Sequence, residues 1–146
     1  MIPSEVDVLV VGAEPAGCAA ARRCAQLDLK TLLIEKKIMP RDKVRSGMLI
    51  GTTAGRLVEQ EFGTVPDNIL AVEKQLAGCI FHVPRQDNEK IDIEIPVTWR
   101  RLLDYWLLQS IASRDIEIIE NARFTHCYQE GNNIIAQIEK DKPFKL

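Results

Sequence analysis

The hydrophobic positions in the first third of the chain form two short runs separated by an alanine-rich stretch. A valine-rich run at residues 6–11 ends at Gly12, and a second apolar run occupies residues 31–35. Apolar runs of this length are typical of strands buried on both faces of a parallel sheet. Between them, Pro15 suits the first turn of a helix, which the alanines of residues 16–25 continue. The segment is therefore predicted to form a β-α-β unit with parallel strands.

The remaining chain alternates between helical and strand-like patterns. Residues 36–51 contain Pro40 and two glycines and show no period, so a long loop is expected. Later segments show either helical spacing or the alternation of strands. The predicted elements are a helix capped by Thr52 or Thr53 that runs to residue 62 and ends at Gly63, a hairpin of strands 75–83 and 90–95, a helix at 98–113 capped by Thr98, a strand at 116–119, and a hairpin of strands 122–129 and 134–139.

The order of these elements predicts the α/β fold class, with a Rossmann-like parallel sheet and antiparallel hairpins. A chain of 146 residues that is 46% hydrophobic can form one compact domain. Its 19 basic and 21 acidic residues give a net charge of −2, so no polybasic surface for nucleic acid or an anionic membrane is expected. A small-molecule partner is favoured instead.

Two further features bear on location and on metals. The amino-terminal residues contain no apolar run long enough for a signal sequence or a membrane span, which predicts a cytoplasmic protein without a transmembrane segment. The four cysteines form no CxxC pair, so buried reduced thiols are expected rather than a metal site.

The turn after the first strand carries most of a dinucleotide fingerprint. Gly12 and Gly17 stand at the first and third glycine positions of GxGxxG, where the first glycine makes the tight turn and the third lets the helix pack on the strand. Glu35 supplies the acid expected about twenty residues further on, which bonds the ribose of the dinucleotide.

Glu14 replaces the second glycine of this fingerprint. At about 4 Å from a diphosphate and an effective dielectric of about 20, its carboxylate opposes binding by about 4 kcal/mol per charge before screening by water. This upper bound corresponds to a loss of affinity on the order of several hundredfold or more. An acid in the first turn of an empty helix is favourable, by about 0.3 to 1 kcal/mol. The sequence thus predicts a retained fold with weakened affinity.

Two stretches, DVLVVGAEPAG and LLIEKK, resemble the FAD-binding start of the glutathione-reductase-type flavoproteins. The loop PRDKVRSGML is similar to the loop that follows the second strand in geranylgeranyl reductases and, more loosely, in aromatic hydroxylases and flavin halogenases. The set Val97, Arg100, Leu103, Asp104 and Leu107 resembles the helix that follows the hairpin in the same group. The resemblance covers nearly the whole chain.

The resemblance implies an FAD cofactor, with Arg100 at the FAD phosphates and the loop of residues 43–48 near the flavin. A forked guanidinium in the first turn of a helix suits phosphate oxygens. Asp104 is expected to be structural, on a helix face or paired with an arginine. No catalytic residue and no metal-ligating residue is assigned. The cofactor-binding set is Gly12, Glu14, Pro15, Ala16, Gly17, Glu35, Lys36, Arg45, Ser46, Gly47, Arg100 and Ala122.

The chain departs from the geranylgeranyl reductase pattern in two further ways besides Glu14. Arg45 stands where these reductases usually have a cysteine, so any role of that thiol is absent. The relatives also continue past this point into a further strand with a Gly-Asp motif and into a substrate chamber. Residues 1–146 are therefore expected to be the N-terminal part of an FAD/NAD(P)-binding domain, incomplete at its C-terminus and without a substrate domain.

Three functions remain open at this stage. The first is an FAD-dependent oxidoreductase of the geranylgeranyl reductase type, with NAD(P)H as a candidate electron donor. The second is a non-catalytic remnant, or a subunit that pairs with a separately encoded C-terminal half of a flavoprotein. The third is a flavin monooxygenase or halogenase, which shares the FAD-binding half and differs in later segments.

Overall fold

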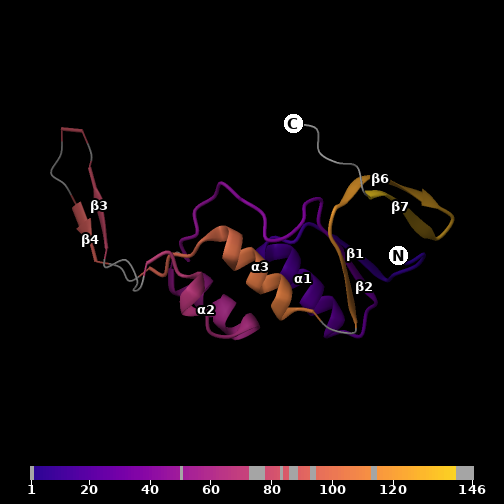
Figure 1. The fold of residues 1–146 in the computed structure, drawn as a ribbon, viewed down its shortest axis with the longest axis horizontal. Helices are drawn as coiled ribbons and strands as arrows, with labels where there is room; N and C mark the ends of the chain where they lie inside the picture. Colours follow the sequence, from indigo (N-terminus) through magenta and orange to yellow (C-terminus); the bar gives the residue numbers. More distant parts are fainter. Residues whose placement is uncertain are drawn as a thin grey trace. The chain divides into compact units, whose positions relative to one another are not determined.

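The structure is a computed structural model that describes residues 2–49, 51–72, 78–82, 84–85, 89–92, 95–112 and 115–140. The chain divides into two compact units, and among the described residues Figure 1 labels all three α-helices and every strand except β5. The first unit comprises Met1–Arg41 and Asp104–Leu146, and the second comprises Asp42–Leu103. Each unit is described by itself.

A parallel three-stranded sheet forms the centre of the first unit. Strands β1 (Val8–Val11), β2 (Thr31–Ile34) and β5 (Ile116–Ile119) lie in the order β1-β2-β5, and both pairings are parallel. Helix α1 (Pro15–Ala25) connects β1 to β2 and begins at the predicted proline. The predicted β-α-β unit and the α/β fold class with a Rossmann-like parallel sheet are therefore confirmed.

The prediction of a strand buried on both faces holds for β2 and is wrong for β1. All four residues of β2 are buried between two neighbouring strands. Within the described residues β1 pairs with β2 alone, its first three residues are half-buried, and Val11 is 55% exposed. A run of valines signals an apolar strand but carries no information on how many neighbours that strand has.

The sheet separates two packed layers because successive side chains of a strand point to opposite faces. Leu32, Ile34 and Ile119 form a buried cluster on one face, against which Phe124 and Ile138 of the second hairpin pack. Helix α1 contacts all three strands and buries the side chains of Cys18 and Ala21. The start of α1 lies at the end of the sheet where β1 and β2 have their carboxyl ends.

The first unit also contains the second predicted hairpin. Strands β6 (Ala122–Glu130) and β7 (Asn133–Lys140) pair antiparallel, with a register shift between Phe124 and His126. Gly131 takes a positive φ of 60° in the connecting turn, where glycine is tolerated without strain. The hairpin prediction is confirmed.

The second unit contains helix α2 (Gly51–Phe62), the 3-10 helix η1 (Asp67–Ile69) and the antiparallel strands β3 (Cys79–Phe81) and β4 (Glu89–Ile91). Helix α3 (Arg100–Ser110) begins in this unit and ends in the first. The predicted helices and hairpin are present. The parts of those predictions at residues 75–77, 83, 86–88, 93–94 and 113 lie outside the described residues.

The predicted helix caps need correction. Helix α2 begins at Gly51, so Thr52 and Thr53 lie inside it rather than before it. Thr98 lies two residues before α3, and its hydroxyl donates to the carbonyl oxygen of Gly47 at 2.8 Å. Thr98 is therefore one residue too early to cap α3, and its actual partner, 51 residues away, is not encoded in the local pattern. Gly63 ends α2 with a positive φ of 91°, as predicted.

In the described part of the chain, no helix has the length and apolarity needed to cross a membrane.

Candidate functional site

The turn between β1 and α1 has the geometry that the two fingerprint glycines predict. Gly12 adopts a φ of 102°, which side chains rarely tolerate, and its N–H donates to the carbonyl oxygen of Ile34 at 2.8 Å. A Cβ placed on Gly17 would overlap the carbonyl oxygen of Gly12. A Cβ placed on Gly12 would meet no atom within 4 Å, so space remains beside the turn. The turn is tight within the fold and open on its other side.

The start of α1 presents free backbone donors at this turn. The first intrahelical hydrogen bond runs from the N–H of Cys18 to the carbonyl oxygen of Glu14. The N–H groups of Ala16 and Gly17 therefore have no acceptor within the helix, and Pro15 has no N–H to satisfy. A helix start of this kind favours a phosphate group through its donors and its dipole.

Glu14 lies at the N-cap of α1, not in the first turn as predicted. Its backbone is extended, with φ −85° and ψ 170°, and within the described residues its side chain makes no capping hydrogen bond. The carboxylate is 44% exposed and lies 3.8 Å from a guanidinium nitrogen of Arg41. Glu14 is thus one position earlier than predicted, and its charge still lies at the end of α1 where the helix dipole favours an acid.

Glu35 follows β2 and lies against the turn. The residue is 3% exposed, its Oε2 accepts the N–H of Ala13 at 3.0 Å, and its Oε1 accepts the N–H of Lys37 at 3.1 Å. These two backbone donors fix the carboxylate at the carboxyl ends of β1 and β2, where doubly wound sheets bind their ligands. The predicted proximity of Glu35 to the Gly12–Gly17 turn is confirmed.

Arg41 joins three carboxyl groups beside this turn, a role that its local sequence does not predict. Its Nη1 donates to Oδ2 of Asp104 at 3.1 Å, its Nε lies 3.4 Å from Oε1 of Glu35, and its Nη2 lies 3.8 Å from Oε1 of Glu14. The expectation that Asp104 pairs with an arginine is confirmed. Two observations could have pointed to Arg41: the expected arginine partner of Asp104, and the resemblance of the PRDK stretch that contains residue 41. No local pattern, however, links residue 41 to residue 104.

Cys18 lies on the inner side of α1 near this cluster. Burial raises the pKa of its thiol to about 12, and the negative charge of Asp104 adds to the shift while Arg41 opposes it. A thiol with a raised pKa stays protonated at neutral pH and is a poor nucleophile. Cys18 is therefore a packing residue, as predicted, whereas Cys24 is half-buried and Cys127 is exposed, so the predicted burial is wrong for these two.

The Cys18 pKa predicts a loss of stability at alkaline pH. Between the ordinary pKa of 9.0 and the folded value of about 12, the unfolded chain releases the thiol proton while the folded chain retains it. The free energy of unfolding should therefore fall as the pH rises through this window. Urea unfolding at several pH values should show a smaller decline for Cys18→Ala than for the natural chain. The exposed Cys127, replaced by alanine, is the control and should leave the decline unchanged.

Two other predicted cofactor-binding residues of the first unit, Lys36 and Ala122, are neighbours of Glu35. Lys36 is exposed. Ala122 is 1% exposed and part of the hydrophobic cluster, and its N–H donates to the carbonyl oxygen of Glu35 at 2.9 Å. Ala122 thus anchors the backbone that carries Glu35.

The remaining predicted residues belong to the second unit. Arg45 and Ser46 are exposed, and the Ser46 hydroxyl accepts the N–H of Met48 at 3.2 Å. Gly47 is required for packing, because a Cβ at this position would overlap the carbonyl oxygen of Thr98. Arg100 opens α3 and is half-buried.

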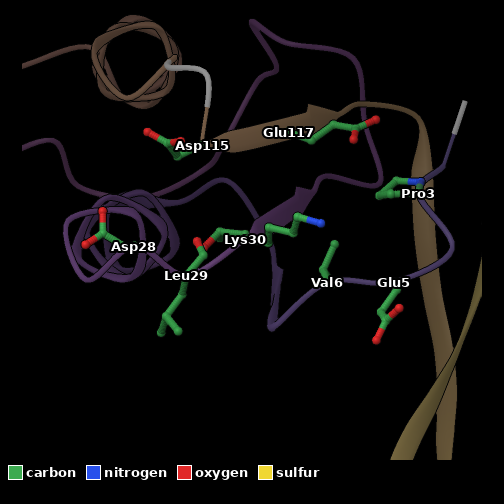
Figure 2. Close-up of a pocket in the computed structure, with 9 residues that line it drawn as sticks. Pro3, Glu5, Val6, Asp28, Leu29, Lys30, Asp115 and Glu117 are labelled. Atoms are coloured by element: carbon green, nitrogen blue, oxygen red, sulfur yellow. The ribbon is translucent and has the colours of Figure 1, made fainter.

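The sheet also has a pocket of about 370 Å³ at its opposite end (Figure 2). Its lining comes from the residues before β1, the start of β2 and the start of β5, which are the amino ends of the parallel strands. It is therefore separate from the Gly12–Gly17 turn. The residues that line the pocket are Pro3, Glu5, Val6, Asp28, Leu29, Lys30, Thr31, Asp115 and Glu117.

Within the described residues no group of acidic, histidine or cysteine side chains could hold a metal ion.

The parallel sheet, the glycine turn and the buried acid after β2 together define a dinucleotide-binding protein of the Rossmann-like class. The sequence profile of the family described as FAD dependent oxidoreductase matches residues 7–144. The chain belongs to that family.

Its relatives include the predicted reductases. A digeranylgeranylglycerophospholipid reductase of Methanopyrus kandleri is 30% identical over 124 residues, which are 82% of this chain and 31% of that protein. The crystal structure of a geranylgeranyl bacteriochlorophyll reductase-like protein from Thermoplasma acidophilum is 26% identical, with a TM-score of 0.74 over 93% of this chain and 35% of that chain. The resemblance to geranylgeranyl reductases is confirmed.

A flavin-dependent brominase, Bmp2, shares the fold with a TM-score of 0.74 at 19% identity, over 94% of this chain and 34% of that chain. At this identity the likeness concerns the fold alone. The chain spans about a third of the length of these relatives.

Proposed function

We propose that this chain provides the FAD-binding part of an oxidoreductase of the geranylgeranyl reductase type. The observation that carries the proposal is the position of Glu35, which the N–H of Ala13 holds beside the Gly12–Gly17 turn. The residues fit the cofactor because the turn leaves open space beside Gly12 and the start of α1 has N–H donors without an acceptor in the helix. A diphosphate suits the donors of Ala16 and Gly17, and a ribose hydroxyl suits the Glu35 carboxylate.

The chain's own residues bind and orient the cofactor in this proposal. FAD, when bound, would supply hydride transfer, and the protein would position it and exclude competing reactions. The donor would be NAD(P)H and the acceptor an isoprenoid-like double bond, both in a cytoplasmic enzyme. Arg100 is assigned to the phosphates and the loop of residues 43–48, with Arg45, Ser46 and Gly47, to the flavin end. Lys36 is assigned to the adenosine end beside Glu35, near Ala122.

FAD titration tests the proposal. The natural chain should bind FAD, with a change in flavin absorbance and fluorescence. Glu35→Gln should weaken binding by about tenfold to a hundredfold, because a hydrogen bond to a charged acceptor contributes about 1.5 to 3 kcal/mol. Glu117→Gln on β5 is the matched control, since this exposed glutamate lies at the amino end of the sheet.

A natural chain that is folded by circular dichroism but binds no FAD would contradict the proposal for this polypeptide. Equal affinities for Glu35→Gln and Glu117→Gln would contradict the role of Glu35.

A second proposal is that β1 pairs with a further strand from a separately encoded C-terminal half. It is supported by the position of β1 at an edge of the described sheet and by the exposure of Val11. An unpaired edge with apolar side chains favours strand addition. Hydrogen exchange tests it: slow exchange of the outer N–H groups of β1 in the isolated monomer would contradict it.

A further inference from the structure

We infer that Arg41 is a positioning residue that makes the dinucleotide turn compatible with Glu14. The inference rests on the proposed function, because it concerns the diphosphate of FAD. Glu14 stands where the fingerprint has glycine, and its carboxylate alone should oppose a diphosphate strongly. The structure places a guanidinium beside that carboxylate, from a loop residue 27 positions later in the sequence.

Buried contacts hold Arg41 in place before any ligand arrives. Its side chain is 6% exposed, and two of its three carboxyl contacts, with Asp104 and Glu35, are with side chains that are at most 4% exposed. Asp104 is carried by α3, and backbone donors hold Glu35. The guanidinium therefore has little conformational freedom, so the Glu14 side chain must adopt the conformation that brings the two groups together.

This arrangement draws the Glu14 carboxylate toward the buried cluster. Glu14 is 44% exposed and lies at the N-cap in an extended conformation, so its side chain can turn without moving the helix. At 3.8 Å the pair is an ion pair and not a close hydrogen bond. The cation offsets the field of the carboxylate at the start of α1, and the donors of Ala16 and Gly17 remain available to phosphate oxygens.

A purely structural Arg41 makes a different prediction from an Arg41 that offsets Glu14. If Arg41 only supports the fold, removing the charge of Glu14 should change FAD affinity by the same factor whether or not Arg41 is present. If Arg41 offsets Glu14, removing that charge should matter more when Arg41 is absent. The two effects should be strongly non-additive, which a double-mutant cycle measures directly.

The experiment measures FAD affinity in the four proteins of a double-mutant cycle and in three further variants. Glu14→Gln removes the charge and keeps the shape, and it is made in the natural chain and in an Arg41→Met/Asp104→Leu background. The paired background is chosen because a buried ion pair can often be replaced by apolar residues without loss of folding, whereas removing one partner is disruptive. Arg41→Lys keeps the positive charge but not the forked guanidinium. It is made in a chain that retains Asp104 and tests whether the charge alone maintains FAD affinity. Glu117→Gln in both backgrounds is the control for a carboxylate remote from the turn.

We expect Glu14→Gln to tighten FAD binding by at least about tenfold more in the Arg41→Met/Asp104→Leu background than in the natural chain. Arg41→Lys should restore most of the affinity that this background loses. Equal gains in the two backgrounds would overturn the inference while the proposed function stands. If the chain binds FAD only after Glu14→Gln, both the inference and the proposed function are overturned for the natural chain.

ADP, which carries the diphosphate without the flavin, separates the two conclusions. If the cycle holds for ADP while FAD does not bind, the inference stands and the proposed function fails. If neither ADP nor FAD binds to any of the four folded proteins, both are overturned.

Discussion

Replacing Gly17 by alanine is expected to destabilise the first unit by about 3 kcal/mol and to abolish FAD binding. A Cβ at this position overlaps the carbonyl oxygen of Gly12, and the nearest side-chain atom, Cγ1 of Val10, is 3.5 Å away. Because the obstructing atom is backbone, α1 must move away from β1 to make room, and overpacking of this kind costs about 1 to 3 kcal/mol or more. Urea unfolding and FAD titration measure the two effects.

Gly55 provides the matched control for this substitution. It lies inside α2, and a Cβ there would meet no atom within 4 Å. Gly55→Ala should raise the free energy of unfolding by about 0.5 to 1 kcal/mol, since alanine is the better helix former. If Gly17→Ala changed the free energy of unfolding as Gly55→Ala does, the inferred close contact between α1 and the turn would be contradicted.

Replacing Asp104 by asparagine is expected to destabilise the protein by about 3 kcal/mol. Asp104 is fully buried and bonds the guanidinium of Arg41 at 3.1 Å. Removing one partner of a buried pair leaves the other charge without compensation, which typically costs about 3 to 5 kcal/mol. The lower end applies because Glu35 still faces Arg41 at 3.4 Å. Urea unfolding of the purified variant measures the change.

An exposed ion pair in the second unit is the control for Asp104. Arg101 and Asp42 lie 3.9 Å apart, and Asp42 is 95% exposed. Asp42→Asn should change the free energy of unfolding by less than about 1 kcal/mol, because water and salt screen such pairs. A loss at Asp104 no larger than the loss at Asp42 would show that the Arg41 cluster does not stabilise the fold.

The predicted elements were accurate where the signal was local. Pro15 marks the start of α1, Gly63 marks the end of α2, and the short apolar runs mark β2 and β5. Each of these features depends on residues within one turn or strand, so periodicity and backbone preference suffice. The prediction for Thr98 failed because α3 begins two residues later, and Thr98 instead bonds Gly47, a contact that the local sequence does not encode.

For the site, the sequence alone determined the glycine turn, the helix start and the acid after β2, because their spacing follows from the lengths of one strand and one helix. The tertiary structure decided the rest. It placed β1 at the edge of the sheet and brought Arg41 to Glu14, Glu35 and Asp104. Arg41 and Asp104 are 63 positions apart, and no local pattern encodes which distant side chains meet. That choice follows from the strand order and from the requirement that a buried charge find a partner.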